Sequence, residues 1–487
     1  MTETVQPHPT ATSRVERPIR QVLLAVPPTG LYIREDRCQT PIKHMPSITL
    51  RPPIDLLYAA AGFEMGGATC TLVDYPAENR DLAGFLDDIR QQQPDLVLLS
   101  ITTPGFDDDM AVAAHIKEVA PATVVAAKGA HFNVLDRQAF EQYPALDLAF
   151  RGEYELACRD LAQGLPWGSI EGLTYRTPAG EIVRTADRPF LEDLDALPFP
   201  ARHLAHNALY VRPDTGEMQT TLVTNRGCPF SCIYCLANQV AGRKNRMRSP
   251  GNILAEIREC VERYGIRNFL FRSDLFTANR AWLLELCRLI QESGLKIAWS
   301  CNSRVDTIDR EMLQVMKAAG CWIIAFGVES GSQEMLDRIN KKTDLSKARQ
   351  ALALTRQAGI LSSIYFLIGL PWETEETLAA NERFAREINP DVLEIFYVYP
   401  FPGTVLHAQA VELGLLCPDQ IPHQAYDAPC MDGLHLTREQ LTAARNRILS
   451  RFYLRPRIIA RTLWRARSLR ELGNYLWYGL RQIKEFL

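Results

Sequence analysis

Two successive series of short apolar strands that alternate with helical stretches constrain the fold of this 487-residue chain more than any other feature. The first series covers residues 19–164, where QVLLAV, PDLVLLS and ATVVAAK have the composition of buried strands. Alternation at this spacing requires crossovers between parallel strands, which are right-handed in nearly all proteins. We therefore predict a doubly wound, Rossmann-like α/β domain over residues 19–164, after a flexible tail over residues 1–18.

The carboxyl ends of the predicted strands in this domain carry small and hydroxyl-bearing residues. They are Pro27 to Gly30, Ser100 to Thr103, and Gly129 to His131. Ligands of doubly wound sheets bind beyond these ends, and small residues allow the backbone to approach a flat or phosphate-bearing ligand closely. The sequence therefore predicts a ligand site at this edge of the sheet.

The second series follows a looser, Pro-rich connection over residues 165–215, which includes a predicted hairpin around Pro178 to Gly180. It covers residues 216–415 and contains six βα-like units, beginning with TTLVTNRGCPF. Because a closed (β/α)8 barrel needs eight such units, we predict a partial (β/α)6 barrel with its chemistry at the strand ends. Residues 416–487 are predicted to form a helical C-terminal domain.

Three of the twelve cysteines, Cys228, Cys232 and Cys235, lie in one loop, RGCPFSCIYC, directly after the first barrel strand. Thiolates this close in sequence can converge on one metal centre. A structural zinc site takes four ligands, and a fourth Cys or His at short spacing is missing. A cubane iron–sulfur cluster normally takes four thiolates too, so three would leave one iron open for a substrate or cofactor. The alternative is a structural zinc loop that borrows a distant ligand.

On these residues the chain resembles the radical SAM superfamily, whose signature is CxxxCxxC with an aromatic residue, here Tyr234, before the last cysteine. The resemblance implies that Cys228, Cys232 and Cys235 hold a [4Fe–4S] cluster whose open iron binds S-adenosylmethionine. One-electron reduction would then release methionine and a 5′-deoxyadenosyl radical. It also implies an external one-electron reductant of the flavodoxin or ferredoxin type.

Later segments extend the resemblance to S-adenosylmethionine contacts. It implies Asp274 for the methionine amine, although FLFRSDLFT lacks the common Gly-Gly-Glu form, and Ser300 and Arg304 for the carboxylate end. It also implies Glu329 for the ribose or amine, with Gly369 on the adenine side and Tyr234 beside the cluster. The alternative for Glu329 or Arg304 is one half of a structural ion pair.

From about Ile19 to Gly403 the chain resembles the cobalamin-dependent radical SAM enzymes of the methylase-like, and more narrowly the hopanoid methylase-like, type. The resemblance implies that cobalamin binds at Thr29, Ser100, Thr102, Gly129, Ala130 and Glu153. Because DxHxxG is missing, it implies base-off binding without a histidine ligand. His131 is the nearest candidate to contradict this, and it can also be an ordinary strand-end histidine. A degenerate fold without cobalamin is the alternative.

The C-terminal segment from Arg451 to Leu487 is basic and aromatic, with Glu471 and Glu485 as its only acids. Such a helix can lie on an anionic membrane surface. The alternative is a helix that packs on the barrel and exposes its arginines to solvent. No signal peptide and no apolar run of about 20 residues is present. We therefore predict a cytoplasmic protein, with peripheral association at the inner face of the membrane through these helices. The net charge of −3 argues against a nucleic-acid partner.

The family resemblance implies an enzyme, a radical SAM C-methyltransferase that acts on an unactivated carbon of an apolar, polycyclic, hopanoid-like substrate. One S-adenosylmethionine would methylate cobalamin, and the radical from a second would activate the substrate. An oxidative cyclase of the magnesium-protoporphyrin ester type would use the same cofactors without methyl transfer. A non-catalytic iron–sulfur and cobalamin sensor is the alternative outside enzymes. The catalytic residues are not identified by the sequence.

Overall fold

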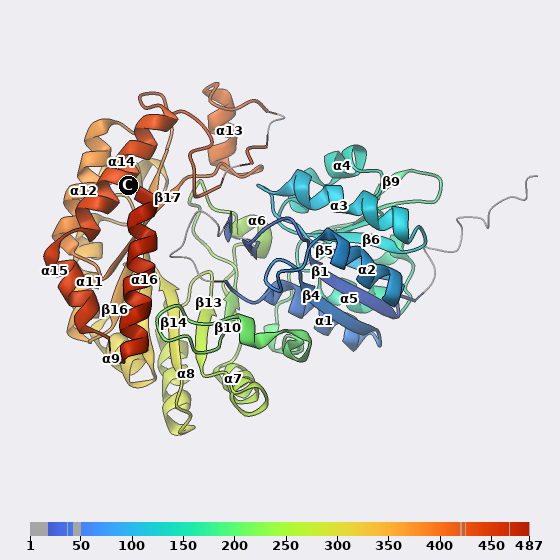
Figure 1. Cartoon of the computed structure of the whole chain (residues 1–487), viewed down its shortest axis with the longest axis horizontal. Coiled ribbons are helices and arrows are strands. Elements are labelled where there is room, and N and C mark those ends of the chain that lie inside the picture. Colours follow the sequence, from blue (N-terminus) through green and yellow to red (C-terminus); the bar gives the residue numbers. More distant parts are fainter. Residues whose placement is uncertain are drawn as a thin grey trace, which may run out of the picture. The chain divides into compact units, whose positions relative to one another are not determined.

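The computed structural model describes residues 18–36, 38–41, 50–418, 421–423, 425–466 and 468–486, so residues 1–17 of the predicted tail lie outside the described residues. The chain forms two compact units (Figure 1). Unit 1 comprises the chain up to Gly30 with Pro53–Leu191 and Leu197–Ala205. Unit 2 comprises Leu31–Pro52, Glu192–Ala196 and the chain from His206 onward.

Unit 1 is built on a seven-stranded sheet in the order β4-β1-β5-β6-β7-β8-β9. Its parallel strands are β1 (Gln21–Val26), β4 (Thr69–Asp74), β5 (Leu96–Ser100), β6 (Val124–Lys128) and β7 (Leu148–Phe150). The predicted hairpin is present as β8 (Leu173–Arg176) and β9 (Ile182–Arg184), and it adds to this sheet as two antiparallel strands. Unit 1 therefore runs beyond residue 164, the end predicted for the first domain.

Helices cover both faces of this sheet (Figure 1). On one face lie α2 (Leu82–Gln92), α3 (Phe106–Val119) and α4 (Phe132–Gln142). On the other lie α1 (Ile54–Met65) and α5 (Glu155–Ala162), which pack against each other. Because both faces are covered, every residue of β5 and β6 is buried. This is the predicted doubly wound fold.

Unit 2 contains six parallel strands that neighbour one another in sequence order, which confirms the predicted partial barrel. They are β10 (Gln219–Val223), β13 (Asn268–Arg272), β14 (Ala298–Ser303), β15 (Cys321–Glu329), β16 (Leu361–Ile368) and β17 (Val392–Tyr397). The helices between them are α7 (Pro250–Tyr264), α8 (Arg280–Glu292), α9 (Arg310–Ala318), α10 (Gln333–Arg338), α11 (Leu345–Gln357) and α12 (Glu375–Ile388).

The two faces of the unit 2 sheet differ in burial. In β17, Leu393 and Ile395 are fully buried in the core that the sheet forms with its helices, whereas Glu394 and Phe396, which alternate with them, are only partly buried. β15 shows a similar contrast, with the small residue Ala325 on its partly accessible side, whereas Thr221 of β10 and Ser363 of β16 are buried. Successive side chains of a strand point to opposite faces, so the partly accessible residues of β15 and β17 lie on the inner face of the partial barrel.

Shorter elements complete unit 2. The cysteine loop lies near β11 (Asn225–Arg226), which pairs with β12 (Arg246–Met247), and leads into α6 (Ala237–Ala241). The hairpin β2 (Tyr32–Glu35) and β3 (Cys38–Pro41) belongs to this unit although it follows β1 in sequence. The C-terminal part is helical as predicted, with α13 (Val405–Glu412), α14 (Arg438–Tyr453), α15 (Pro456–Trp464) and α16 (Leu469–Phe486).

Candidate active site

The three cysteines lie in the loop between β11 and α6, and each is partly buried. The loop begins at Gly227, whose φ is +90° and where a Cβ atom would lie 2.1 Å from the carbonyl oxygen of Lys244. Only glycine fits there. The Gly227 amide donates to a carboxylate oxygen of Asp274 at 2.5 Å, so Asp274 at the end of β13 fixes the start of the loop.

Charged side chains surround the middle cysteine. Burial is the main effect on the Cys232 thiol and raises its pKa, while Lys341 and Arg304 lower it and Glu329 raises it further. Three thiols in one short loop, next to two cationic side chains, fit an anionic iron–sulfur cluster with one open iron. Within the described residues, no three His, Cys, Asp or Glu side chains are arranged to hold a single metal ion.

Glu329 and Lys341 form a buried ion pair beside the loop, with 2.6 Å between a carboxylate oxygen and Nζ. Lys341 also lies 3.4 Å from the hydroxyl of Tyr234. Burial, together with the negative charge of Glu329, raises the pKa of the Tyr234 phenol well above its usual value. Glu329 has a φ of +70° at a register shift between β15 and β16, a strained conformation of the kind that functional sites retain.

Arg304 is also an ion-pair partner. Its guanidinium makes two bonds to the Asp306 carboxylate, at 2.9 and 2.7 Å, and donates to the carbonyl of Lys341 at 3.0 Å. It stacks over the ring of Phe230 in the cysteine loop, with 3.7 Å from Cζ to the ring centroid. The ion-pair alternative therefore holds for both Glu329 and Arg304. Their contacts with S-adenosylmethionine remain predictions.

The two remaining residues predicted for S-adenosylmethionine lie apart from this network. Ser300 is on the inner face of β14 and is partly accessible. Gly369 follows β16 with a φ of +90°, and its amide donates to Glu373 at 2.5 Å, as does that of Leu370 at 3.1 Å. Burial raises the pKa of Glu373 to about 8, although these two hydrogen bonds lower it.

At the carboxyl edge of unit 1, one acid joins two of the predicted residues. Asp109 in the first turn of α3 accepts hydrogen bonds from the hydroxyl of Thr29 and from the amide and hydroxyl of Thr102, the latter two at 3.0 and 3.2 Å. Gly129 at the end of β6 lies so close to the neighbouring strand end that a Cβ atom would be 2.4 Å from the carbonyl oxygen of Ile101. Ser100 and Ala130 are buried at the same strand ends.

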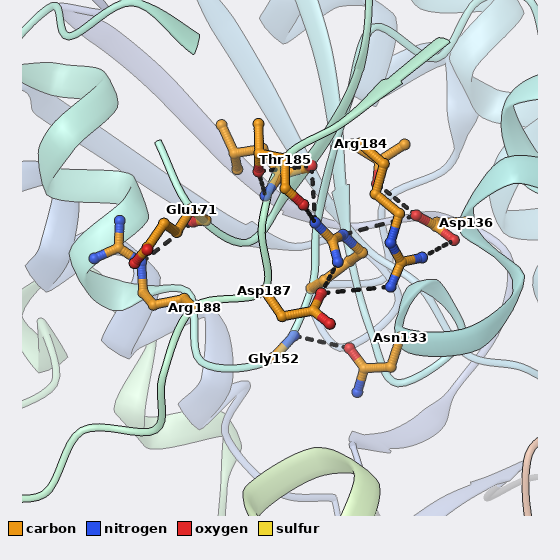
Figure 2. A network of polar contacts seen from close by, with 11 residues as sticks. Asn133, Asp136, Gly152, Glu171, Arg184, Thr185, Asp187 and Arg188 are labelled. Atoms are coloured by element: carbon orange, nitrogen blue, oxygen red, sulfur yellow. Dashed lines mark hydrogen bonds and ion pairs between the residues drawn. The ribbon is translucent and has the colours of Figure 1, made fainter. Parts of the chain in front are cut away.

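Glu153, which was also predicted to bind cobalamin, lies after β7. Its carboxylate accepts a hydrogen bond from the amide of Leu191 at 2.8 Å. Figure 2 shows the polar network beside it, in which Asn133 accepts from the amide of Gly152 at 2.8 Å and Asp136 pairs with Arg184 at 2.6 Å. This network ties the turn after β7 to α4 and to the hairpin. The short side chains at the ends of β1, β5 and β6 fit a large flat ligand that the backbone approaches closely.

His131 stacks flat on Phe106, with 3.7 Å between ring centroids and an interplanar angle of 10°. It is buried, and burial lowers its pKa to about 3, so the imidazole is neutral. Its Nδ1 has no hydrogen-bond partner among the described residues.

Lys341 and Asp109 were not predicted from the sequence. Lys341 is buried although Lys342 follows it directly, and a sequence does not show which of two adjacent lysines is buried. Asp109 is the third of three consecutive aspartates, and its position opposite Thr102 is a result of the helix that follows the loop.

Two family models match the chain: "Radical SAM superfamily" over residues 222–385 and "B12 binding domain" over residues 50–162. An uncharacterized methyltransferase (PH0819) of Pyrococcus horikoshii is 28% identical over 450 residues, which cover 92% of this chain and 95% of the relative. The anaerobic magnesium-protoporphyrin IX monomethyl ester cyclase of Rubrivivax gelatinosus is 28% identical over 364 residues, 72% of this chain and 65% of the cyclase.

Among solved structures, the cobalamin-dependent S-adenosylmethionine radical enzyme OxsB with aqua-cobalamin and S-adenosylmethionine bound has a similar fold. The TM-score is 0.72 at 17% identity, and the match covers 96% of this chain and 72% of OxsB. Within the part of the chain that the structure describes, none of the helices has the length and apolar character needed to cross a membrane.

Proposed function

We propose that this chain, which belongs to the cobalamin-dependent radical SAM enzymes, is a methyltransferase that adds a methyl group to an unactivated carbon of an apolar ring system. The observation that carries the proposal is the position of the cysteine loop. The loop lies beside the Glu329–Lys341 ion pair, and that pair lies over Gly327, on an inner face where residues of β15 and β17 are partly accessible. A substrate carbon needs an accessible surface next to the site where a radical is generated.

Residues of this chain would hold both cofactors. Cys228, Cys232 and Cys235 would bind the cluster, and the strand ends around Thr102 and Gly129 would hold the corrin. When bound, the cluster and cobalamin supply reductive cleavage of S-adenosylmethionine and a transferable methyl group.

The side chains of the protein position S-adenosylmethionine and the cysteine loop. The Glu329 carboxylate, held by Lys341, would accept hydrogen bonds from the ribose hydroxyls or the amine of S-adenosylmethionine. Arg304 keeps the cysteine loop in place through its contact with Phe230. The apolar core on the helix side of the sheet holds the strands that carry these residues in place.

The test uses the full chain, reconstituted anaerobically with iron, sulfide and cobalamin, and S-adenosylmethionine that carries a trideuterated methyl group. We expect 5′-deoxyadenosine with a low-potential reductant, and a product of a supplied hopanoid or related polycycle that is heavier by one labelled methyl group. The variant Cys232→Ala should produce neither. A fully loaded cluster that forms no 5′-deoxyadenosine would favour the sensor instead.

Oxidative cyclisation is the second candidate, and it is favoured by the similarity to the cyclase of Rubrivivax gelatinosus. A cyclase product would gain oxygen and a ring but no labelled methyl group. Product mass therefore separates the two reactions. Either reaction requires an external one-electron reductant, for which we propose a flavodoxin or a ferredoxin.

We also propose that the enzyme associates with the membrane surface through α15 and α16. One stripe of α16 exposes apolar side chains, because residues spaced by seven and four positions share a helix face. Its exposed fractions are 88% for Leu469, 49% for Leu476 and 62% for Leu480, and Trp464 at the end of α15 is 91% exposed. Arg457 on α15 and Arg470 and Arg481 on α16 are exposed as well.

An anionic lipid surface matches this combination of exposed leucine, tryptophan and arginine. A second copy of the same surface would bring like charges together. The neighbouring helix α14 differs, because its Ile448 and Phe452 pack in the barrel core and the Tyr453 hydroxyl bonds to the backbone of Leu393. Packing on the barrel thus describes α14, Ile458 of α15 and the side of α16 that carries Asn474, which donates to the carbonyl of Asp214, but not the exposed stripe of α16.

Sedimentation of the full chain with vesicles tests the association. We expect binding to phosphatidylglycerol vesicles and little binding to phosphatidylcholine vesicles. The double substitution Leu476→Glu and Leu480→Glu should abolish binding, whereas Leu413→Glu, at an exposed leucine outside these helices, should not. Equal binding of both variants would contradict the proposal. A truncation before Phe452 is unsuitable because it would open the core.

A further inference from the structure

The inner face of the unit 2 sheet carries one acidic side chain with an unusual environment, Glu394 on β17. Its neighbours along the strand, Leu393 and Ile395, are buried on the helix side, so Glu394 faces inward. The side chain of Glu394 is partly accessible to solvent. Protein atoms nevertheless surround its carboxyl group, and this burial raises the pKa of the carboxyl to about 7. A side chain in this position lies within the protein and can still be reached by a ligand.

Two groups act on this carboxylate. The hydroxyl of Ser363, on the adjacent strand β16, donates to it at 3.0 Å, and this bond lowers the pKa. The charge of Arg51 also lowers it, but Arg51 is paired with Glu35 at 3.1 Å. Among the described residues, Glu394 therefore makes one neutral hydrogen bond, and Arg51, whose charge acts on it, is also paired with another acid.

Aromatic rings lie on the same inner face around Glu394. Tyr365 pairs with Glu394 in the strand register, so the two side chains are neighbours on one face. The rings of Tyr365 and Phe396 are 5.6 Å apart, and those of Phe396 and Tyr426 are 6.0 Å apart in an edge-to-face arrangement. All three side chains are only partly buried, so they offer apolar surface to a ring-bearing ligand.

The strand register also relates Glu394 to the Glu329–Lys341 pair. Gly327 on β15 pairs with Tyr365, and Tyr365 pairs with Glu394, so these positions form one row across the inner face. A Cβ atom on Gly327 would meet Glu329 at 2.5 Å and Lys341 at 3.0 Å, so the ion pair occupies the space above this glycine. Adjacent strands are about 4.8 Å apart, which places Glu394 roughly 10 Å from that space.

We infer that Glu394, supported by Ser363, binds a hydrogen-bond donor or a positive charge of the substrate, whose ring system lies against Tyr365 and Phe396. The inference rests on the proposed function, because it assigns this inner face to the substrate of the same reaction. A substrate anchored there spans the roughly 10 Å to the Glu329–Lys341 pair with two or three fused rings. A carbon far from its polar group would then lie next to the S-adenosylmethionine site.

The charge and the hydrogen bonding of the Glu394 carboxylate favour one class of substrate. A carboxylate that is surrounded by protein and short of donors is stabilised by a ligand hydroxyl, amine or ring N–H. A ligand carboxylate or phosphate would face the like charge of Glu394 without water between them. The site therefore favours neutral or cationic ring compounds with a donor group and rejects anionic ones.

The test measures binding of three naphthalene probes by equilibrium dialysis with the full-length, reconstituted enzyme at pH 8. The probes are 2-naphthylmethylamine, 2-naphthylmethanol and 2-naphthoate, which share one ring system and differ in the polar group. We expect the amine to bind most tightly, the alcohol next and the carboxylate at least tenfold more weakly than the amine. Glu394→Gln should reduce amine binding about tenfold and relieve the rejection of 2-naphthoate.

Two further variants sharpen the result. Ser363→Ala should weaken amine binding less than Glu394→Gln does, and Glu376→Gln, at an exposed acid on α12, should leave all three affinities unchanged. Amine and carboxylate binding that do not differ, or that Glu394→Gln leaves unchanged, would overturn the inference. If 2-naphthoate bound best, Arg51 rather than Glu394 would set the specificity and the inference would also fail.

The proposed function is measured separately in the same preparations, as 5′-deoxyadenosine formation. Formation of 5′-deoxyadenosine without probe selectivity would leave the enzyme proposal intact and remove the assignment of Glu394. Selectivity that depends on Glu394 in a protein that forms no 5′-deoxyadenosine would retain the binding site and remove the methyl-transfer proposal.

Discussion

The two units are built from the same alternation of strand and helix, yet their sheets offer ligands different surfaces. In unit 1 every residue of β5 and β6 is buried, because helices cover both faces of the sheet. In unit 2 helices cover one face, and inward-facing residues of β15 and β17 remain partly accessible. A ligand therefore cannot lie on the faces of these strands in unit 1 and has to bind at their ends, whereas unit 2 offers both strand ends and an inner face.

Small residues therefore have different structural roles in the two sheets. At the edge of unit 1, Gly129 allows two backbone segments to meet, and the atom that an added Cβ would approach most closely is the backbone oxygen of Ile101. On the inner face of unit 2, Gly327 and Ala325 leave space that the ends of the Glu329 and Lys341 side chains partly fill. Adding one methyl group at each glycine should thus have unlike consequences.

The largest effect is expected for Gly129→Ala in unit 1. The new Cβ atom would lie 2.4 Å from the carbonyl oxygen of Ile101, and the residue has a φ of +152°, which disfavours alanine. We expect the free energy of unfolding of unit 1 to fall by about 3 kcal/mol. Hydrogen exchange of β5 and β6 by mass spectrometry would report it, and cobalamin binding, followed by its visible absorbance, should be lost.

Gly180→Ala is the matched control. Gly180 has a φ of +87° in the turn between β8 and β9, but nothing lies within 4 Å of a Cβ atom there. We expect it to cost only about 1 kcal/mol, from backbone strain alone. Equal effects of the two substitutions would show that strain, and not the close approach at the edge, governs Gly129.

The sequence identified both sheets because strand and helix periodicities depend on local side-chain burial. It also identified the cysteine loop and its family, since the spacing of Cys228, Cys232 and Cys235 lies within one short segment. It did not distinguish the faces of β15, because CWIIAFGVE is apolar almost throughout, whether a residue faces the helices or the inner surface. The placement of the segment before α1 with unit 2 also depends on contacts far away in the chain.

Site residues that depend on long-range pairing were the hardest to predict. Lys341 reaches Glu329 and Tyr234 only because a strand end and the turn after α10 are brought together. Thr29 and Thr102 share a carboxylate that sequence analysis did not single out. The roles of these residues toward the cofactors remain predictions, whereas the domain pair that binds such cofactors is confirmed by the two family matches.

An intermediate effect is expected for Gly327→Ala in unit 2. Its backbone is not in the left-handed region, and the new Cβ atom would meet only the ends of two side chains. We therefore expect the free energy of unfolding to change by less than about 1 kcal/mol. Displacement of the Glu329 carboxylate should weaken S-adenosylmethionine binding about tenfold, as measured by equilibrium dialysis.

The result for Gly327→Ala tests whether the inner face of the unit 2 sheet is less tightly packed than the carboxyl edge of the unit 1 sheet. If Gly327→Ala destabilised the protein as much as Gly129→Ala, the inner face would be as tightly packed as the edge of unit 1. Unchanged S-adenosylmethionine binding at unchanged stability would instead show that the Glu329–Lys341 pair does not contact the cofactor.

The smallest effect concerns carboxylates at the strand ends of the two units. Asp109 in unit 1 accepts hydrogen bonds on both carboxylate oxygens, whereas Glu373 in unit 2 accepts two on one oxygen, and its other oxygen has no partner among the described residues. Burial raises the pKa of Glu373 to about 8. The folded protein therefore binds a proton at Glu373 that the unfolded chain, with an ordinary carboxyl pKa, has released at neutral pH.

Because the folded state holds this extra proton, the contribution of Glu373 to stability is largest at low pH and falls as the pH rises toward and past 8. Between pH 7 and pH 8 the wild-type protein should lose about 1 kcal/mol of unfolding free energy relative to Glu373→Gln, which cannot ionise. Urea unfolding of both proteins at the two pH values measures the difference, with Glu375→Gln at an exposed neighbour as control. Parallel pH profiles for wild type and Glu373→Gln would mean that the free oxygen of Glu373 finds a partner, and that the strand ends of the two units are equally well satisfied.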